Sequence, residues 1–291
     1  MPDLKTTYSP NRSPLMQVLR ALSSIIPGDY LKTALYLNLI ARPRRTLRLA
    51  LGTFYRIDHI YDILREAKNS YRGDFSILEF GTSDGYAFTK MLYATRYTGM
   101  EDRVVVHTFD SFEGMPAAVD DKDVDLIGGD SWVPGQFRGR YEHLLQYCTA
   151  RYKNFRIHKG YFDNTLTDEL LESLKSHPPI LVWIDCDYYS SAKAVWERLM
   201  PQLPNGCVVY FDEYDNLNFG SRFTGEARLV YEVNHGKFGE NIELVLDKRL
   251  GLDSDRIYRF VRCGSPLCYP ALPGENAAEV VHLRTNDSPL P

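Results

Sequence analysis

Five apolar runs, separated mostly by helix-like stretches, constrain what this chain can fold into. Turn residues bound each run, and the runs span Phe75 to Phe80, Val104 to Phe109, Phe155 to His158, Ile180 to Asp185 and Cys207 to Phe211. Strands that alternate with helices form a parallel sheet. Because helices cover both faces of such a sheet, its strands read as continuous apolar runs without alternation, as Ile180 to Ile184 does. The sequence therefore predicts an α/β fold with a parallel sheet and helices on both faces.

The end of the pattern predicts a different kind of strand pairing. A helical stretch around Glu226 to His235 is followed by two further strand candidates, Ile242 to Asp247 and Arg256 to Val261. About eight residues separate these two runs, which is too short for the crossover that parallel strands need. We therefore expect a C-terminal hairpin that places one antiparallel strand in the sheet.

Charge and the spacing of metal-binding residue types disfavour several classes of protein. The formal net charge is −4, from 34 Lys and Arg against 38 Asp and Glu, so no general electrostatic attraction to nucleic acid is expected. The five cysteines show no CxxC pair and the seven histidines show no HxxxH spacing, which disfavours a zinc site and fits a reducing compartment. No run approaches the roughly 18 apolar residues that a membrane span needs. We expect a soluble cytoplasmic protein.

The pattern divides the chain into three parts, which are residues 1–71, 72–263 and 264–291. In the first part, apolar periodicity predicts helices over Ile26 to Ala67. Tyr30 to Ala41 and the four arginines after it also look like a basic amphipathic membrane binder, but no lipidation signal supplies a second anchor. We therefore favour an acceptor lid or a dimer contact. The second part carries the sheet and a further predicted lid over Asp120 to Arg138, and the third is a Pro-containing tail.

The first group of candidate functional residues lies where a buried strand ends and a helix begins. The stretch Glu79-Phe-Gly-Thr-Ser-Asp-Gly85 has this position, and Asp110 ends the next strand. Small residues let a ligand approach the backbone, but the complete GxGxxG of a dinucleotide site is missing and Glu79 would repel a pyrophosphate. S-adenosylmethionine, which carries an ammonium and no phosphate, fits better, with Asp110 placed to accept hydrogen bonds from the ribose hydroxyls. The alternative is that Gly81 and Gly85 only shape a tight turn.

The second group consists of carboxylates at the ends of the fourth and fifth predicted strands. Asp185 and Asp187 follow the fourth strand, and Asp212 and Glu213 follow the fifth. In an open α/β sheet, ligands bind at this carboxyl edge. Oxygens of Asp185, Asp212 and Glu213 would form the hard-cation site that magnesium prefers. The alternatives are that Asp187 caps the next helix and that Asp212 and Glu213 are solvated loop acids.

Five motifs, taken in order, resemble those of the macrocin O-methyltransferase family. They are Glu79-Phe-Gly81, Thr108-Phe-Asp-Ser-Phe-Glu-Gly-Met-Pro116, Gly160-Tyr-Phe-Asp-Asn-Thr-Leu166, Asp185-Cys-Asp-Tyr-Tyr-Ser-Ser191 and Asp212-Glu-Tyr214. The resemblance covers about Ile77 to Phe260, and five ordered motifs are more specific than any one. It implies a class I methyltransferase sheet, S-adenosylmethionine, a magnesium ion and a sugar-like hydroxyl acceptor. The expected antiparallel strand agrees with it, because nicotinamide-binding Rossmann sheets are parallel throughout.

The resemblance also implies roles for individual residues. Glu79 and Gly81 would contact the amino-acid part of the cofactor and Asp110 the ribose. The full set of cofactor-binding candidates is Glu79, Gly81, Thr82, Ser83, Gly85, Asp110, Ser111, Phe112, Tyr161, Phe162, Asp163 and Asp185. In that set, Ser111 and the segment from Tyr161 to Asp163 would hold the adenine. The metal ligands would be Asp185, Asp212 and Glu213. The chain departs from the family at Glu213, where an aspartate is usual, and at Ser83, which often is glycine.

These residues together predict magnesium-assisted O-methyl transfer from S-adenosylmethionine to a hydroxyl group. The favoured acceptor is a small molecule, such as a sugar of a natural product or a glycan. Asp185 or Asp187 is expected to act as the base, because magnesium polarises a bound hydroxyl less strongly than zinc does. The alternatives are an NAD(P)-dependent oxidoreductase and a catalytically silent protein that only binds the cofactor. A homo-oligomer is compatible with the sequence.

Overall fold

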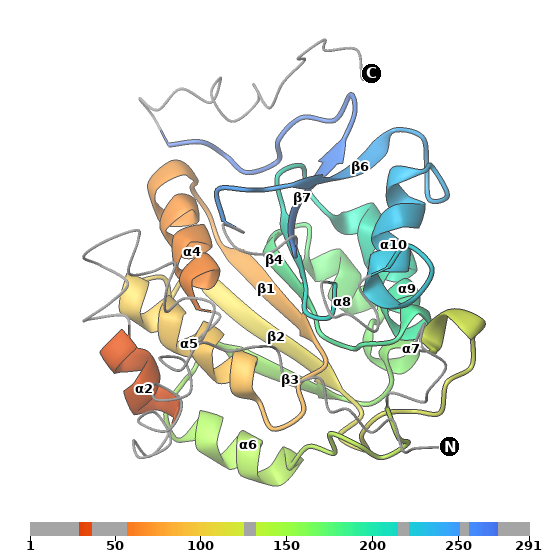
Figure 1. The fold of residues 1–291 in the computed structure, drawn as a ribbon. Coiled ribbons are helices and arrows are strands. Elements are labelled where there is room, and N and C mark those ends of the chain that lie inside the picture. Colours follow the sequence, from red (N-terminus) through yellow and green to blue (C-terminus); the bar gives the residue numbers. More distant parts are fainter. Residues whose placement is uncertain (1–28, 37–56, 125–131, 215–220, 251–255, 273–291) are drawn as a thin grey trace, which may run out of the picture.

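A seven-stranded sheet forms the centre of the protein in the computed structural model, which describes residues 29–36, 57–124, 132–214, 221–250 and 256–272. Its strand order is β3-β2-β1-β4-β5-β7-β6 (Figure 1). Strands β1 to β5 are parallel, and β7 is antiparallel to both β5 and β6. The strands are β1 (Phe75–Phe80), β2 (Val104–Asp110), β3 (Phe155–Lys159), β4 (Pro179–Ile184), β5 (Val208–Phe211), β6 (Ile242–Leu246) and β7 (Ile257–Arg262). The predicted parallel sheet with one antiparallel strand from a C-terminal hairpin is confirmed.

Helices cover both faces of this sheet (Figure 1). One face is covered by α4 (Asp58–Ser70), α5 (Tyr86–Thr98) and α6 (Tyr141–Thr149). The other is covered by α8 (Asp168–Ser173), α9 (Tyr189–Leu199) and α10 (Gly225–Asn234). The remaining described helical segments are α2 (Asp29–Tyr36), α7 (Phe162–Thr165) and the 3₁₀ turns η2 (Asp121–Asp123) and η3 (Met200–Gln202).

Burial explains why the strands could be recognised from their composition. All residues of β1, β4 and β5 are buried, since these central strands have a hydrophobic core on each side. In the first core, the rings of Trp183 and Tyr210 stack with centroids 3.7 Å apart. In contrast, β3 lies at an edge of the sheet and is only partly buried, although its His158 ring stacks on Phe109 of β2. The continuous apolar runs thus mark the centre of the sheet.

The register of the parallel strands brings the candidate acids to one edge. Glu79 in β1 is aligned with Thr108 in β2 and Trp183 in β4. In turn, Ile184 at the end of β4 is aligned with Phe211 at the end of β5. The residues that follow these strand ends therefore lie side by side, as expected at the carboxyl edge of a parallel sheet.

A buried arginine joins the last strand to the first described helix of the sheet domain. Arg259 in β7 donates hydrogen bonds of 3.0 and 2.8 Å to the two carboxylate oxygens of Glu66 in α4. It also donates to Asp247, just after β6, at 2.8 Å, and to the carbonyl oxygen of Gly206 at 3.0 Å. The guanidinium is therefore fully engaged with carboxylate and carbonyl acceptors, which its burial requires.

Residues 264–272, assigned from sequence to the tail, pack against the start of the sheet. Arg72 donates its backbone N–H to the carbonyl oxygen of Pro270 at 2.7 Å, and Leu272 donates to Ser70 at 3.0 Å. The Tyr269 side chain is only 4% exposed, and its hydroxyl donates to the carbonyl oxygen of Pro179, at the first residue of β4. These contacts join the described C-terminal residues to the end of α4.

The described helix α2 falls within the predicted helical region Ile26 to Ala67, and α4 begins within it and ends beyond it, at Ser70. Residues 37–56, with the arginines that resemble a membrane binder, lie outside the described residues, as do residues 125–131 of the predicted lid and 273–291 of the tail. No helix among the described residues is both long enough and apolar enough to cross a bilayer.

Candidate active site

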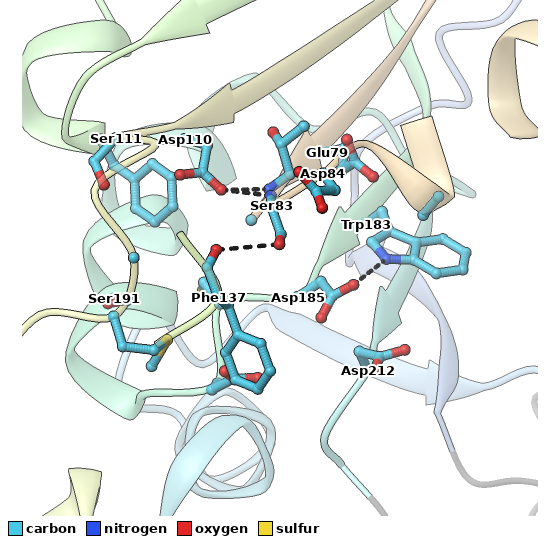
Figure 2. A pocket seen from close by; sticks show the side chains of 18 of the residues that line it. Glu79, Ser83, Asp84, Asp110, Ser111, Phe137, Trp183, Asp185, Ser191 and Asp212 are labelled. Carbon is cyan, nitrogen blue, oxygen red and sulfur yellow. Dashed lines mark hydrogen bonds between the residues drawn. The ribbon is translucent and has the colours of Figure 1, made fainter. Parts of the chain in front are cut away.

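A cavity of about 450 Å³ opens at the carboxyl edge of β1, β2, β4 and β5 (Figure 2). Most of the candidate residues line it, namely Glu79, Gly81, Thr82, Ser83, Asp110, Ser111, Tyr161, Phe162, Asp185, Asp187, Asp212 and Glu213. Three other candidates do not line it. Gly85 precedes α5, Phe112 is buried with its ring against Tyr141, and Asp163 lies in α7. The structure therefore brings the two predicted groups of residues into one cavity.

Gly81 brings the loop after β1 into direct contact with the loop after β4. Its φ is +95°, and a Cβ atom built there would lie 1.7 Å from the carbonyl oxygen of Asp185. No side chain can occupy that space, so this position requires glycine for both its conformation and its close approach. The first loop and the acid-bearing loop are consequently held against one another.

Asp110 fixes the shape of the first loop. One of its carboxylate oxygens accepts the backbone N–H groups of Thr82 at 2.7 Å and Ser83 at 2.8 Å, and the other accepts that of Phe112 at 2.6 Å. A carboxylate offers about four acceptor positions, so these bonds leave room for a ribose hydroxyl. The sequence predicted only the ribose contact, and the structure adds the support of the loop itself.

Glu79 is a buried carboxyl group facing the same cavity. Its side chain is 1% exposed, and the hydroxyl of Thr108 donates to it. Burial raises the pKa of Glu79 to about 8, with a smaller contribution from the charge of Asp110 and an opposing one from the Thr108 hydrogen bond. A cation bound beside Glu79 would favour its ionised form. This is the environment expected for a carboxyl group that receives an ammonium.

Four further carboxylates surround the ends of β4 and β5. Burial raises the pKa of Asp185 well above its ordinary value, and the charges of Asp212 and Asp187 raise it further. The pKa of Asp187 is also raised by burial, followed by the charges of Glu213 and Asp212. The Trp183 indole donates to Asp185 at 3.3 Å (Figure 2). These acids repel each other, so the cluster favours either protons or a bound cation.

The chemistry of these donors fits magnesium, but their described positions do not assemble a site. Asp212 accepts a hydrogen bond of 2.7 Å from the Tyr210 hydroxyl, and its carboxylate lies 3.6 Å from the Arg256 guanidinium. Within the described ranges, no three His, Cys, Asp or Glu side chains are grouped closely enough to hold a metal ion. Holding a metal with Asp185, Asp212 and Glu213 would therefore require side-chain movement.

Glu226, on α10, connects the two acid-bearing loops and was not identified from sequence. Its side chain is fully buried, and its two oxygens accept the backbone N–H groups of Cys186 at 3.3 Å and Glu213 at 3.1 Å. Cys186 lies between Asp185 and Asp187, so one carboxylate holds both loops in place. No local pattern reveals this, because the contact spans 40 residues of sequence.

The proposed helix-cap role of Asp187 is taken by a different residue. The N–H of Ser190, in the first turn of α9, donates to Asp123 at 2.8 Å. Asp123 is 2% exposed and also accepts the N–H groups of Val119 and Asp120. It therefore ties the described start of the predicted lid to α9. Asp187 instead lines the cavity, with a φ of +61°.

The end of the predicted lid and the two residues that follow it, residues 132–140, are fixed to the first loop. The Ser83 hydroxyl donates to the carbonyl oxygen of Phe137 at 3.1 Å, and the Arg140 side chain pairs with Asp84 at 3.1 Å. A Cβ atom on Gly139 would lie 2.2 Å from the Ser83 carbonyl oxygen, so the two backbones touch. The loop predicted to bind the cofactor and the end of the predicted lid are thus in direct contact.

Phe137 and Trp132 are two of the aromatic residues that line this acid-rich cavity. Phe137 has a φ of +60°, which costs a bulky residue about 1–2 kcal/mol relative to right-handed backbone. Its ring is 47% exposed and lies 5.1 Å from that of Trp132, centroid to centroid. Both residues line the cavity. The predicted lid contained them, but neither was selected as a site residue, because their place depends on the loop conformation.

The charge of the cavity agrees with a cationic cofactor. Acidic residues among those that line it are Glu79, Asp84, Asp110, Asp185, Asp187, Asp212 and Glu213. Lys90 is the one lysine or arginine among the described lining residues. S-adenosylmethionine carries a sulfonium and an ammonium, both favoured by such a surface, whereas the pyrophosphate of a nicotinamide dinucleotide would be repelled.

Comparisons with known proteins support the same assignment. Residues 78–214 match the family described as "Methyltransferase domain". A solved structure of CalS11, a calicheamicin methyltransferase, is 22% identical, with a TM-score of 0.50 over 81% of this chain and 92% of that one. The O-methyltransferase NovP is 21% identical, with a TM-score of 0.48 over 72% and 79% of the two chains. No curated protein sequence matches this chain.

The matched residues begin in β1 and extend just past β5, so they include the first loop, Asp110 and both acid-bearing loops. The likeness to CalS11 shows that the mixed sheet with its antiparallel β7 is the class I methyltransferase fold. The fold, the domain match and the acidic cofactor cavity agree: this chain carries an S-adenosylmethionine-dependent methyltransferase domain.

Proposed function

We propose that the protein transfers the methyl group of S-adenosylmethionine to a hydroxyl oxygen of a small molecule that contains a sugar or a similar ring. The observation that carries this proposal is the contact between the cofactor loop at Gly81 and the acid-bearing loop at Asp185. It supports an arrangement in which the acids after β4, with Asp187 as the proposed base, lie beside the loop expected to bind the cofactor. The motif resemblance to sugar-modifying O-methyltransferases supports the choice of a hydroxyl acceptor.

Asp187 is the proposed base. Burial and the charge of Glu213 raise its pKa, and a base is most effective when its pKa lies nearer the working pH than that of an exposed aspartate. Asp187 takes the proton as the hydroxyl oxygen attacks the methyl carbon in line with the departing sulfur. The new carbon–oxygen bond forms as the carbon–sulfur bond breaks, and S-adenosylhomocysteine leaves as a neutral thioether. Asp185, beside Gly81, orients the reacting groups.

Magnesium is part of this proposal as an aid to deprotonation, because a bound divalent ion lowers the pKa of a hydroxyl group. Asp185, Asp212 and Glu213 would hold it after Asp212 exchanges its present contacts with Tyr210 and Arg256. Chelation should then abolish turnover and leave cofactor affinity nearly unchanged, with activity restored by added magnesium. Full turnover in a chelated, metal-free preparation would remove the ion from the proposal.

The function is tested with labelled S-adenosylmethionine and a panel of pyranosides and phenols, with products identified by mass spectrometry. Asp187→Asn preserves the shape of the side chain and tolerates positive φ, so it should keep the fold. We expect kcat to fall roughly 10²- to 10⁴-fold, while S-adenosylhomocysteine affinity stays within threefold of wild type. Asp102→Asn, at an exposed residue paired with Lys153, is the control. Methylation only of nitrogen or carbon atoms would contradict the proposal.

A further inference from the structure

We propose that the ring of Phe137 is the platform on which the apolar face of the acceptor ring lies, in the cavity that Asp185 and Asp187 also line. This inference rests on the proposed function and deepens it, since it assigns a specificity-determining residue and a ligand shape to the same cavity. The ligand is a hydroxylated ring with polar edges and apolar faces, as in a pyranose.

The backbone of Phe137 is the first observation. A φ of +60° is unusual for any residue with a bulky side chain, and glycine would adopt it without strain. The chain nevertheless has phenylalanine here, and the ring is 47% exposed instead of buried in the core. Backbone strain of this kind is concentrated at binding and catalytic sites, where the surrounding structure maintains it. Packing of the core therefore does not explain this residue.

The direction of the ring is the second observation. Figure 2 shows the Phe137 side chain pointing into the space between Asp185 and Ser191. All three residues line the cavity, so the ring faces the same space as the acid cluster. Trp132 packs against the ring at an interplanar angle of 65°, which limits how far it can turn. The cavity thus offers an aromatic surface as well as carboxylate oxygen acceptors.

The third observation is that the loop is already in place. Gly135 donates its N–H to the carbonyl oxygen of Met115 at 2.8 Å, and Met115 donates to that of Gln136 at 2.8 Å. At Phe137 itself, the backbone carbonyl oxygen accepts a hydrogen bond from the Ser83 hydroxyl. A platform whose backbone is held in this way loses little conformational entropy when a ligand binds. Its contact with Ser83 also places it at a fixed position relative to the cofactor loop.

These observations match the two surfaces of a hydroxylated ring. The carbon–hydrogen face of a pyranose packs on an aromatic ring, and its hydroxyl groups project from the edge. With the apolar face on Phe137, the hydroxyl groups at the edge would face the space that the acids also line. An acyclic polyol offers similar hydroxyl groups but no flat apolar face, so the platform would favour the cyclic acceptor.

The experiment compares Phe137→Ala, which removes the platform, with Phe137→Tyr, which retains an aromatic ring. Phe223→Ala is the matched control, because Phe223 is a phenylalanine with 57% exposure that does not line the cavity. Methyl rhamnopyranoside and sorbitol are the probes. Acceptor binding is measured by saturation-transfer NMR in the presence of S-adenosylhomocysteine, turnover by mass spectrometry, and S-adenosylhomocysteine affinity by calorimetry.

We expect Phe137→Ala to lose the saturation signal of the pyranoside and to raise its KM at least tenfold, with kcat and cofactor affinity within threefold of wild type. Phe137→Tyr should restore the KM, and Phe223→Ala should match wild type. An unchanged KM in Phe137→Ala overturns the platform and leaves methyl transfer standing. Equal losses of acceptor and cofactor affinity, or a wild type that methylates sorbitol as well as the pyranoside, also overturn it. A wild type that binds the pyranoside but methylates no hydroxyl contradicts the proposed function instead.

Discussion

Glu79 lies in β1 with its carboxyl group removed from water and facing the cofactor cavity. Because burial raises its pKa to about 8, this group is mostly protonated at pH 7 in the free protein. The ammonium of the cofactor should lower that pKa and ionise the group on binding. We therefore expect Glu79 to release a proton when the ammonium of the cofactor binds.

This exchange predicts that S-adenosylhomocysteine binding at pH 7 releases nearly one proton from Glu79. Its affinity should rise from pH 6 through the pKa of about 8, as less free energy is needed to ionise the group, and level off only well above that pKa. Calorimetry in buffers of different ionisation enthalpy measures the released proton. Glu79→Gln should remove this release and flatten the pH dependence. An equal release from Glu79→Gln would assign the proton to another group.

At the residue scale, the sequence predicted the acids at the ends of strands. It missed residues whose place in the site depends on contacts distant in sequence or on loop conformation. Glu79, Asp110 and Asp185 were found because a buried strand ending in a carboxylate is a local pattern. Glu226 and Phe137 were not found, since the first acts across 40 residues and the second depends on its backbone conformation. Nothing local to the sequence encodes either.

At the scale of elements, the segment 132–140 and the loop after β1 that is expected to bind the cofactor meet at Gly139. Its Cβ, if present, would lie 2.2 Å from the Ser83 carbonyl oxygen and 2.7 Å from the attached carbon. Backbone atoms cannot rotate away as a side chain can, so one of the two loops must move. A substitution at Gly139 should therefore change the affinity for the cofactor.

We predict that Gly139→Ala weakens S-adenosylhomocysteine binding roughly tenfold to hundredfold, about 1.4–2.8 kcal/mol. Gly135→Ala is the control from the same loop, because its φ of +83° adds strain although a Cβ there meets no atom within 4 Å. Calorimetry on both variants separates displacement of the cofactor loop from general loosening of the lid. Equal affinities in the two variants would show that the lid and the cofactor loop are independent.

The strands were predicted to within about one residue at each end, because central strands have no polar face to confuse the pattern. Contacts between separate elements were harder to predict from the sequence. The Asp123 carboxylate that caps α9 comes from the lid, and helix-start patterns examine only the residues next to the helix. The contacts of residues 264–272 with α4 were also hidden, since a proline-containing segment without periodicity predicts no packing.

At the scale of the whole molecule, the Arg259 cluster joins the two ends of the sheet domain. The Arg249 and Arg259 side chains hold the pKa of Asp247 at about 2 against the opposing effect of burial, and Arg259 also binds Glu66. A depressed folded-state pKa stabilises the fold above the unfolded pKa of about 4, and this contribution is lost as pH falls toward 2.

Glu66→Gln should therefore destabilise the protein, by up to about 3–5 kcal/mol, since it leaves part of the Arg259 charge unpaired. Urea unfolding at pH 7 measures the loss. Glu240→Gln, at an exposed residue for which the structure describes no ion pair, serves as the control. In wild type the free energy of unfolding should decline between pH 4 and 2. A loss below 1 kcal/mol in Glu66→Gln would show that Asp247 alone satisfies Arg259.

The attachment of residues 264–272 to α4 and β4 also has a consequence for how the chain matures on the ribosome. Tyr269 fills a buried position beside Phe75, at the first residue of β1, so the first strand of the sheet is completed by a residue that is synthesised long after it. Contacts of such high sequence separation slow folding, because a long loop must close first. A nascent chain that stops before Tyr269 therefore exposes the apolar start of its own sheet. We expect chaperones to bind this apolar surface until Tyr269 has been synthesised.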